Sequence, residues 1–367
     1  MGRALTVGTW LLAGALVATG ASPRAARADD PAPKPRPRKV IEVTPATVQA
    51  IDRGLQAIAR RQRRDGSIES SVPVAATAIG CLAFMSGGST PGRGPHAENI
   101  TRGLEFILRC VTREGFITEI GSNSSGMHGH GFAVLFLAES LGMIEDPYLY
   151  DRALEALRKS VSCIERAQNQ YGGWNATPDG GRNDDGSGAV AVMQVAALRA
   201  ARNNGIAVNP GTIEQAKKYL LLMTSTDGWT QYNYGFRGSH RSAGLTGPGM
   251  YMLGALGLFD DGKYEKGIKN VVRSAPFLGG NASNDSGWSR WYYYTLFYSS
   301  LAVFQYGGQD WEKWYPAMRD SVLKMQKTDG TFDDDPYGGL YGAFAVLSLA
   351  LPYRYLPMFQ DGGLGGD

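Results

Sequence analysis

The chain has 367 residues, of which 43% are hydrophobic, and a formal net charge of +3. Residues 1–28 hold three arginines and no acidic residue, so the remainder carries 34 basic and 34 acidic residues. This balance, with no basic cluster beyond the segment at 31–39, argues against nucleic acid as the partner. Four histidines and three cysteines, without a Cys/His cluster or CxxC spacing, argue against zinc.

The first 28 residues have the features of a secretory signal peptide. Arg3 gives a basic start, residues 5–21 form an apolar run, and Ala26-Arg27-Ala28 fits a small-x-small cleavage site. No stop-transfer stretch follows, so we expect cleavage near Ala28, export to the periplasm or beyond, and no transmembrane span in the mature chain. An uncleaved N-terminal anchor is the alternative. Residues 29–44 then form an extended linker rich in proline, lysine and arginine.

Residues 168–206 predict two helices joined by a turn-rich loop. Gly172-Gly173 and the segment at 178–181 cannot continue a helix, because glycine is entropically costly there and proline lacks a donor. From Ser187 the residues are small or apolar until Asn203-Asn204-Gly205 ends the helix. A helix with so little charge should be buried on most sides.

The same unit occurs six times along the chain: an amphipathic helix, a polar glycine turn and a more apolar helix. The turns are Asp65-Gly66-Ser67, Glu114-Gly115-Phe116, Gly172-Gly173-Trp174, Asp227-Gly228-Trp229, Ser286-Gly287-Trp288 and Asp329-Gly330-Thr331. The first and last turn glycines give a mean period of about 53 residues, longer than the repeats typical of open solenoids.

Two concentric layers explain the two kinds of helix: charged helices outside and apolar helices lining an inner ring. An open solenoid would need capping repeats and polar faces on both helices. We therefore predict an all-α fold, a closed α/α toroid of about six helix pairs. It should form one domain over residues 45–358, followed by a glycine-rich tail at 359–367.

Several of these motifs resemble a known repeat family. The Gln-x-x-Asp-Gly-Ser/Thr turns at 62–68 and 326–332, together with Gln168 and Gly173-Trp174, resemble the prenyltransferase and squalene oxidase repeats of terpenoid cyclases and protein prenyltransferases. Residues 129–133 and 341–357 look like exported bacterial members of that family. The resemblance implies that the turn glutamine and aromatic residue tie neighbouring repeats together, by hydrogen bonds to the next helix and by filling the gap between helices.

The resemblance also raises the question of a catalytic acid. Squalene-type cyclases use an Asp-x-Asp-Asp motif, whose acid must be kept protonated. Two imperfect matches exist: Arg182 precedes Asn183-Asp184-Asp185, and Phe332 precedes Asp333-Asp334-Asp335. We take Asp184, Asp185 and Asp334 as candidate acids. The alternative is that these carboxylates cap the following helices. A zinc prenyltransferase is rejected, because no cysteine has an aspartate two residues before it.

Histidines in two turns are further candidates. His128 and His130 open the second apolar helix, where a helix N-terminus favours the neutral imidazole of a general base or hydrogen-bond donor. His240 lies in another turn and should face the same rim. The alternative is that they bond loop carbonyls. We predict no metal and no cofactor. Cys81, Cys110 and Cys163 are interpreted as core thiols, although export would permit one disulfide.

Aromatic residues are dense between positions 288 and 315. At helical spacing Trp291 and Tyr294 share one face with Tyr298, and Trp288 shares another with Tyr292. Such faces stabilise a carbocation or stack on sugar rings, and plain core packing is the alternative. We take Trp288, Trp291 and Tyr294, with His128 and His240, as candidate ligand-binding residues.

Three hypotheses follow from these observations. The first is a terpenoid-cyclase-like protein that acts on or binds an isoprenoid or other hydrophobic ligand in a central cavity. The second is a carbohydrate-active enzyme, since α/α toroids also host glycosidases, with acids from different repeats facing one another across about 5–10 Å. The third is a non-catalytic exported scaffold that binds a protein partner. Fold analogy alone does not choose among them.

Overall fold

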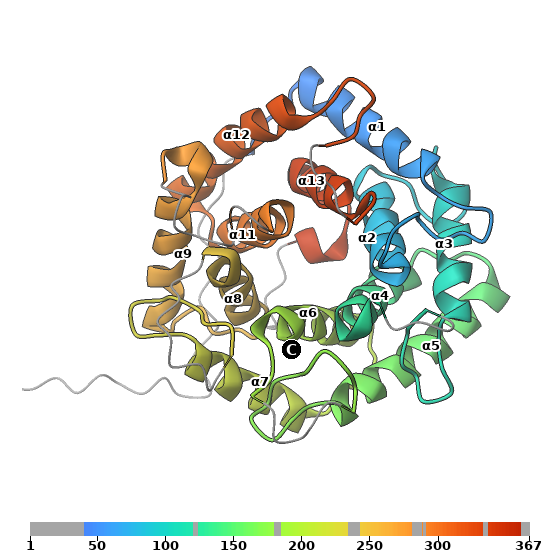
Figure 1. Cartoon of the computed structure of the whole chain (residues 1–367), viewed down its shortest axis with the longest axis horizontal. Helices are drawn as coiled ribbons and strands as arrows, with labels where there is room; N and C mark the ends of the chain where they lie inside the picture. The colour runs from blue at the N-terminus through green and yellow to red at the C-terminus, as the bar shows by residue number, and fades with distance from the viewer. Residues whose placement is uncertain are drawn as a thin grey trace, which may run out of the picture. The chain divides into compact units, whose positions relative to one another are not determined.

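The computed structural model describes residues 40–119, 124–179, 185–233, 243–280, 288, 291–332 and 337–360. All of them belong to one compact unit, residues 33–367. The helices of this part of the chain alternate between an outer and an inner layer (Figure 1). The outer helices are α1 (Pro45–Arg60), α3 (Ala97–Arg109), α5 (Pro147–Arg166), α7 (Pro210–Met223), α9 (Gly262–Ser274) and α12 (Gly308–Met325). The inner helices are α2 (Pro73–Ser86), α4 (Gly126–Leu141), α6 (Gly188–Asn203), α8 (Ala243–Ala255), α11 (Tyr292–Tyr306) and α13 (Leu340–Ala350).

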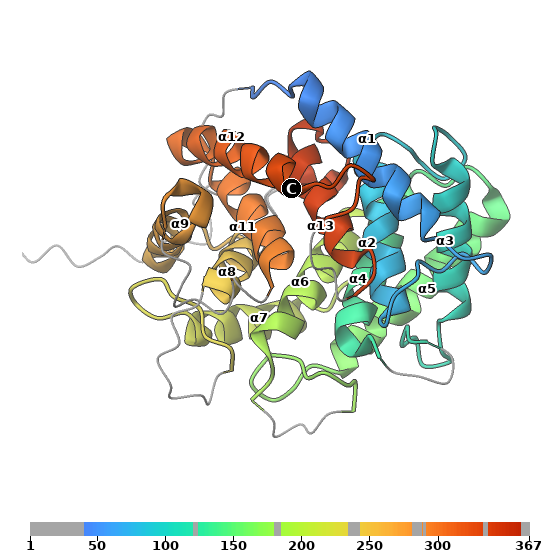
Figure 2. The same cartoon turned by 45° about the horizontal axis from the view of Figure 1, so that its top comes forward.

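Both layers close on themselves. Each inner helix packs against the next inner helix, and α13 returns to pack against α2. In the outer layer α12 contacts α1. Figure 2 shows the inner helices enclosed by the outer ones. The predicted all-α closed toroid of six helix pairs is therefore confirmed, and the described residues contain isolated β-bridges but no strand.

Burial differs between the two layers as the sequence pattern predicts. In α2, 13 of 14 residues are buried, whereas α1 buries 7 of 16 residues along one stripe. An inner helix touches its two ring neighbours, an outer helix and the material on the ring axis, so it needs an apolar surface on all sides. The helix at Gly188–Asn203 is buried in the same way and ends before Gly205, as expected.

The turns between outer and inner helices repeat one backbone conformation. In five described copies the amide of one residue donates to the carbonyl four residues later, as Asn169 does to Gly173. The glycine inside each turn has φ between +85° and +89°. At Gly172 an added Cβ would lie 2.2 Å from the carbonyl oxygen of Gln215 on the next outer helix. Glycine is required there both for the left-handed backbone and for this close approach.

Three of these turns carry the glutamine expected to join neighbouring repeats. Its Nε2 donates to a carbonyl of the next outer helix: Gln62 to Asn99 at 2.8 Å, Gln168 to Thr212 at 3.0 Å, and Gln326 to Ala50 at 2.8 Å. The last of these bonds joins the final repeat to the first. The glutamines therefore connect repeats, as the sequence suggested.

The C-terminal segment enters the ring from the end at which the inner helices finish. It contains the short 3-10 helices η2 (Leu351–Tyr353) and η3 (Pro357–Phe359). The Met358 amide donates to Glu139 Oε2 on α4 at 2.9 Å, and the Phe359 ring lies 6.4 Å from that of Phe297 on α11. Because α4 and α11 lie on opposite sides of the inner ring, residues 358–359 lie on its axis (Figure 1).

Two further expectations concern cysteines and the membrane. Cys81, Cys110 and Cys163 are all buried and free, so the disulfide that export would permit is not formed. They are core thiols, and burial raises the pKa of Cys110 and Cys163 to about 11. In the described ranges, no helix has both the length and the apolar character that a membrane crossing needs.

Candidate functional site

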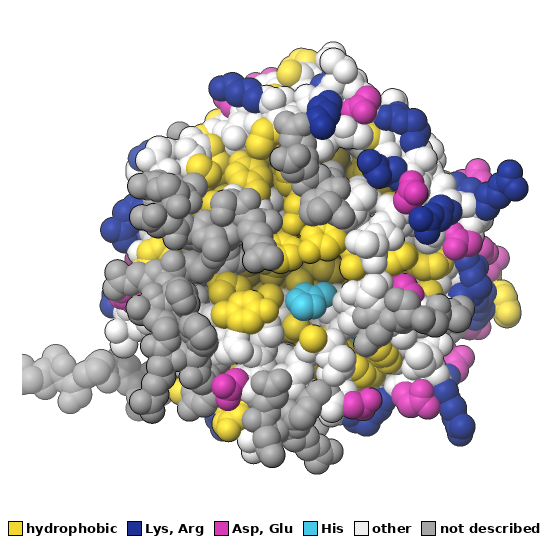
Figure 3. Space-filling model, viewed as in Figure 1, with side chains coloured by type: hydrophobic (Ala, Val, Ile, Leu, Met, Phe, Trp, Pro, Cys, Tyr) yellow, Lys and Arg dark blue, Asp and Glu magenta, His cyan; other side chains and the backbone are white. Residues whose placement is uncertain are grey.

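A cavity of about 500 Å³ opens at the end of the ring where the inner helices begin. Every inner helix contributes to it through its first turns or the residues just before them. The lining residues are Val72, Ala75, Ser124, Ser125, His128, Phe132, Ala189, Met193, Tyr232, Gly244, Leu245, Trp291, Tyr294, Tyr337, Leu340, Tyr341 and Phe344. Figure 3 shows this hollow as a concentration of hydrophobic side chains with one histidine beside them.

The deep part of the cavity is aromatic and apolar. Phe132 of α4 and Phe344 of α13 meet edge to face with ring centroids 5.8 Å apart, and Tyr294 of α11 lies 6.0 Å from Phe344. Phe344 in turn packs on Phe297 at 5.5 Å, the residue that contacts Phe359. The C-terminal segment therefore supports the cavity floor from below and closes the ring at that end.

The mouth of the cavity carries two exposed aromatic side chains. Trp291 is 41% exposed and Tyr232 is 51% exposed, although both line the cavity. The Trp291 ring stacks on Tyr337 with centroids 5.9 Å apart and planes inclined by 13°. The Tyr232 carbonyl accepts a hydrogen bond of 2.8 Å from the Gly188 amide at the start of α6. Both residues are thus anchored to the frame of the ring.

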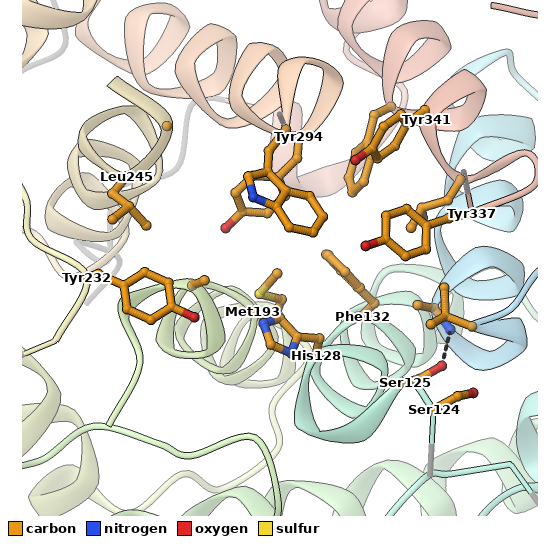
Figure 4. Close-up of a pocket in the computed structure, with 17 residues that line it drawn as sticks. Ser124, Ser125, His128, Phe132, Met193, Tyr232, Leu245, Tyr294, Tyr337 and Tyr341 are labelled. Carbon is orange, nitrogen blue, oxygen red and sulfur yellow. Dashed lines mark hydrogen bonds between the residues drawn. The ribbon is translucent and has the colours of Figure 1, made fainter. Parts of the chain in front are cut away.

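His128 lies in the cavity wall, on the first turn of α4. Its side chain makes no hydrogen bond to the described residues, and Figure 4 shows the Tyr232 hydroxyl directed toward it. Burial lowers the pKa of His128 to about 4, so the imidazole is neutral at pH 7. A neutral imidazole offers one donor and one acceptor to a ligand.

His130 is placed differently, away from the cavity lining. It is fully buried, and its Nδ1 accepts a hydrogen bond of 3.1 Å from the Ile117 amide in the preceding turn. In two other repeats a threonine hydroxyl makes the corresponding bond: Ile68 donates to Thr77 and Thr230 donates to Thr246. Burial lowers the pKa of His130 to about 3. In this position His130 joins a turn to its inner helix and lies outside the cavity lining.

A buried carboxylate, Glu119, lies just behind the cavity wall. It accepts hydrogen bonds from the hydroxyl and amide of Ser125 and, at 3.0 Å, from the Val74 amide. Two helix N-termini thus meet at this carboxylate, since Val74 is the second residue of α2 and Ser125 precedes α4. Glu119 fixes Ser125, which lines the cavity.

Of the three candidate acids, only Asp185 lies among the described residues. Asp184 and Asp334, like His240, lie outside the described residues. Asp185 is half-buried just before α6, and its carbonyl accepts a hydrogen bond of 3.1 Å from the Tyr219 hydroxyl. It does not line the cavity, although Ala189, four residues later, does. Ser187 is the N-cap residue of α6, and its side chain makes no capping hydrogen bond.

The candidate aromatic residues separate into two groups. Trp291 and Tyr294 line the cavity, as expected of ligand-binding residues. Trp288 is 3% exposed and packs on Phe277, Tyr292 and Trp314, so it belongs to the core between α11 and the outer layer. The packing alternative therefore describes Trp288 better than ligand binding does.

Sequence reasoning missed several residues that form the site. Tyr337, Tyr341 and Phe344 come from the last repeat, which was interpreted only as repeat structure, and Tyr232 follows the fourth turn. Aromatic residues in the first turns of the inner helices were the available signal. Within the described part of the chain, no three His, Cys, Asp or Glu side chains are placed to hold a metal, and no carboxylate lines the cavity.

The sequence matches no protein-family model and no curated protein. Solved structures with a similar fold exist. An inactive double-aspartate variant of the α-1,6-mannanase GH76A of Salegentibacter sp. HEL1_6, in complex with α-1,6-mannotriose, aligns with a TM-score of 0.62 and 9% identity over 83% of this chain and 99% of that one. A variant of the type II terpene cyclase MstE from Scytonema, in complex with geranylgeranyl dihydroxybenzoate, aligns with a TM-score of 0.57 and 12% identity over 85% and 98%. At such identities the likeness shows a shared fold alone.

Proposed function

We propose that the protein binds an isoprenoid or similar hydrophobic ligand in the cavity at the N-terminal ends of the inner helices. The observation that carries this proposal is the cavity itself, about 500 Å³ in volume and lined mainly by apolar and aromatic side chains. Ligand sites are commonly concave, mostly apolar and about 300–1,000 Å³ in volume. The terpene cyclase of similar fold was determined with a geranylgeranyl ligand, which supports the same class of ligand here.

The physical basis of binding would be burial of apolar surface. Each Å² of apolar surface removed from water contributes about 25 cal/mol, and the aromatic floor formed by Phe132, Tyr294 and Phe344 adds edge-on contacts. Because the described lining contains no carboxylate, we propose binding as the basic activity. For an acid-catalysed cyclisation, Asp184, Asp185 and Asp334 remain our candidate acids.

The test is mass spectrometry of lipids that co-purify with the protein. An Ala189→Trp variant should fill part of the cavity and lose the bound lipid. An Ala207→Trp variant, at an exposed position between α6 and α7, is the matched control and should keep it. If wild-type protein carries no lipid and takes up none when supplied with isoprenoid alcohols, the proposal is wrong. Recovery of an exported protein partner instead would favour the scaffold hypothesis.

A second candidate function is glycoside hydrolysis by Asp184 and Asp185. It is favoured by one specific parallel: the mannanase of similar fold is inactive when two adjacent aspartates are replaced, and this chain carries an adjacent pair. Asp185 precedes α6 at the same end of the ring as the cavity. Release of reducing sugar from α-1,6-mannan, abolished in Asp184→Asn and Asp185→Asn, would establish it. Unchanged release in both variants would eliminate these residues as the acids.

We further propose that the protein is exported after cleavage near Ala28. The proposal rests on the basic start, the apolar run and the cleavage motif of residues 1–28. N-terminal sequencing of the mature protein should begin at Asp29. An intact Met1 in membrane-bound protein would instead indicate an uncleaved anchor.

A further inference from the structure

The mouth and the floor of the cavity differ in chemistry. The floor presents carbon surfaces from Phe132, Met193 and Phe344. The mouth presents the Trp291 indole, the Tyr232 phenol and the His128 imidazole, each of which combines a flat ring with a hydrogen-bonding group. A ligand that satisfies both parts must be apolar at one end and polar at the other.

Two large aromatic side chains at the mouth, Trp291 and Tyr232, are exposed to solvent. Only seven large hydrophobic side chains of the described residues are classed as exposed, and Trp291 and Tyr232 are two of them at one opening. Exposed apolar surface that is gathered at one place marks an interaction site. Stacking on Tyr337 holds the Trp291 ring in position, so a ligand would meet a preformed surface.

The polar end of the ligand should be uncharged. None of the described lining residues carries a charge at neutral pH, since burial keeps His128 neutral. An ionised group placed in such surroundings would lose its hydration without gaining a counter-ion, which is costly. Hydroxyl groups, in contrast, could exchange hydrogen bonds with His128 and with the Tyr232 hydroxyl, which is directed toward it (Figure 4).

These requirements are met by a sugar joined to an apolar chain. A sugar ring has a face of C–H groups that stacks on an aromatic ring and an edge of hydroxyls that bond to polar groups. We propose that the natural ligand is a glycolipid, with its apolar chain in the cavity and its uncharged sugar at the mouth, stacked on Trp291 and hydrogen-bonded by His128 and Tyr232. This inference rests on the proposed function of the cavity and names the class of ligand.

The test compares probes that share one chain and differ in the head group. Dodecyl maltoside and dodecyl phosphate are titrated calorimetrically below their critical micelle concentrations. Dodecanol is titrated below its solubility limit, and maltose is titrated alone. We expect dodecyl maltoside to bind about threefold to tenfold more tightly than dodecanol, the gain typical of one aromatic contact. Dodecyl phosphate should bind more weakly than dodecanol, and maltose should show no measurable binding.

A pair of matched variants tests whether the higher affinity for dodecyl maltoside arises at the mouth of the cavity. Trp291→Ala should lower the ratio of dodecyl maltoside to dodecanol affinity toward one, because only the hydrogen bonds from His128 and Tyr232 would remain. Tyr148→Ala, a change at an aromatic residue 72% exposed on α5, should leave the ratio unchanged. Equal binding of dodecyl maltoside and dodecanol by the wild type, or a ratio unaffected by Trp291→Ala, would overturn the glycolipid inference alone. Failure of every dodecyl probe would overturn the proposed function itself.

Discussion

The two ends of the ring are built from the same six inner helices and yet differ in what occupies the axis. At the end where the helices begin, the axis is open and lined by aromatic side chains. At the other end the axis is filled by the chain's own C-terminal segment, with Leu356 and Phe359 fully buried. The repeat therefore sets the frame of the ring, and the material placed on the axis decides which end can receive a ligand.

This contrast separates stability from binding. Side chains at the filled end are packed on all sides, so their removal should reduce the free energy of unfolding. Side chains at the open end border a void, so their removal should change ligand affinity with little effect on folding. Variants at the filled end should therefore change stability most, and variants at the open end should change it least.

Phe359→Ala should destabilise the protein strongly. The ring is fully buried at the filled end and packs against Phe297, so its loss leaves a cavity and should lower the free energy of unfolding by about 3–5 kcal/mol. Urea unfolding followed by circular dichroism measures the change. Tyr355→Ala, at a position 53% exposed in the same segment, is the control and should cost far less. Equal effects of the two changes would mean that the segment is not packed on the axis.

Glu139 should make the filled end sensitive to pH. Burial raises its pKa to about 7, against the lowering effects of the Met358 amide and the Arg199 charge, whereas a glutamate in an unfolded chain titrates near 4.3. Between about pH 4.3 and pH 7 the folded state keeps a proton that the unfolded state loses. The free energy of unfolding should therefore fall as pH rises through this window, by roughly 4 kcal/mol.

Urea midpoints of the wild type and Glu139→Gln, measured from pH 4.5 to pH 8, test this prediction. The glutamine keeps a carbonyl acceptor for the Met358 amide and cannot ionise, so the difference between the two curves isolates Glu139. The wild type should lose stability relative to the variant as pH rises. Parallel curves would show that Glu139 does not titrate in this range.

Gln326→Ala should have an intermediate effect, because the open end is held by its turns. The Gln326 amide donates to the Ala50 and Gly330 carbonyls at 2.8 and 3.3 Å, and we expect its loss to cost about 1–2 kcal/mol. Thermal unfolding measures the change. Lys327→Ala, at the next position of the same turn, is the control. An effect of Gln326→Ala no larger than the control's would mean that the closing bond contributes nothing to stability.

Trp291→Ala should change stability least, by less than about 0.5 kcal/mol, because the ring is 41% exposed at the mouth. The same variant carries the largest expected effect on sugar-dependent affinity. Differential scanning calorimetry of the ligand-free protein measures the first quantity. A loss of stability comparable with that of Phe359→Ala would remove the distinction between the two ends.

The sequence predicts the ring of helix pairs and its turns well, because short stretches of residues determine each helix and each turn. The turn glycines need a left-handed backbone, the turn glutamines need a carbonyl within reach, and the apolar helices need burial on all sides. Each requirement is visible in a short stretch of residues. Ring closure followed from the number and the length of the repeats, and α13 packing on α2 confirms it.

The site was harder to predict for two reasons. The direction in which each side chain points depends on how its helix is rotated in the ring, and the depth of the cavity depends on which segment fills the ring axis. His128 and His130 are two residues apart on one helix and therefore point in different directions; only His128 faces the cavity. Nothing local distinguishes them. Phe359 was expected to begin the glycine-rich tail at 359–367, yet it is fully buried together with Leu356 on the axis of the ring. Glu139 was not among the predicted residues. A single carboxylate in an otherwise apolar helix indicates a buried ionisable group, and this signal was available in the sequence.

The bond between Gln326 and Ala50 joins residues 276 positions apart, and it sets limits on how this chain can fold and evolve. A chain still emerging during synthesis lacks its last repeat and so cannot complete the ring, which makes the final closure a late, non-local event. A seventh repeat could not be added without opening the circle, unlike growth of a linear array. A circular permutant cut between two central repeats and joined through residues 40–44 and 360 would keep every neighbour contact.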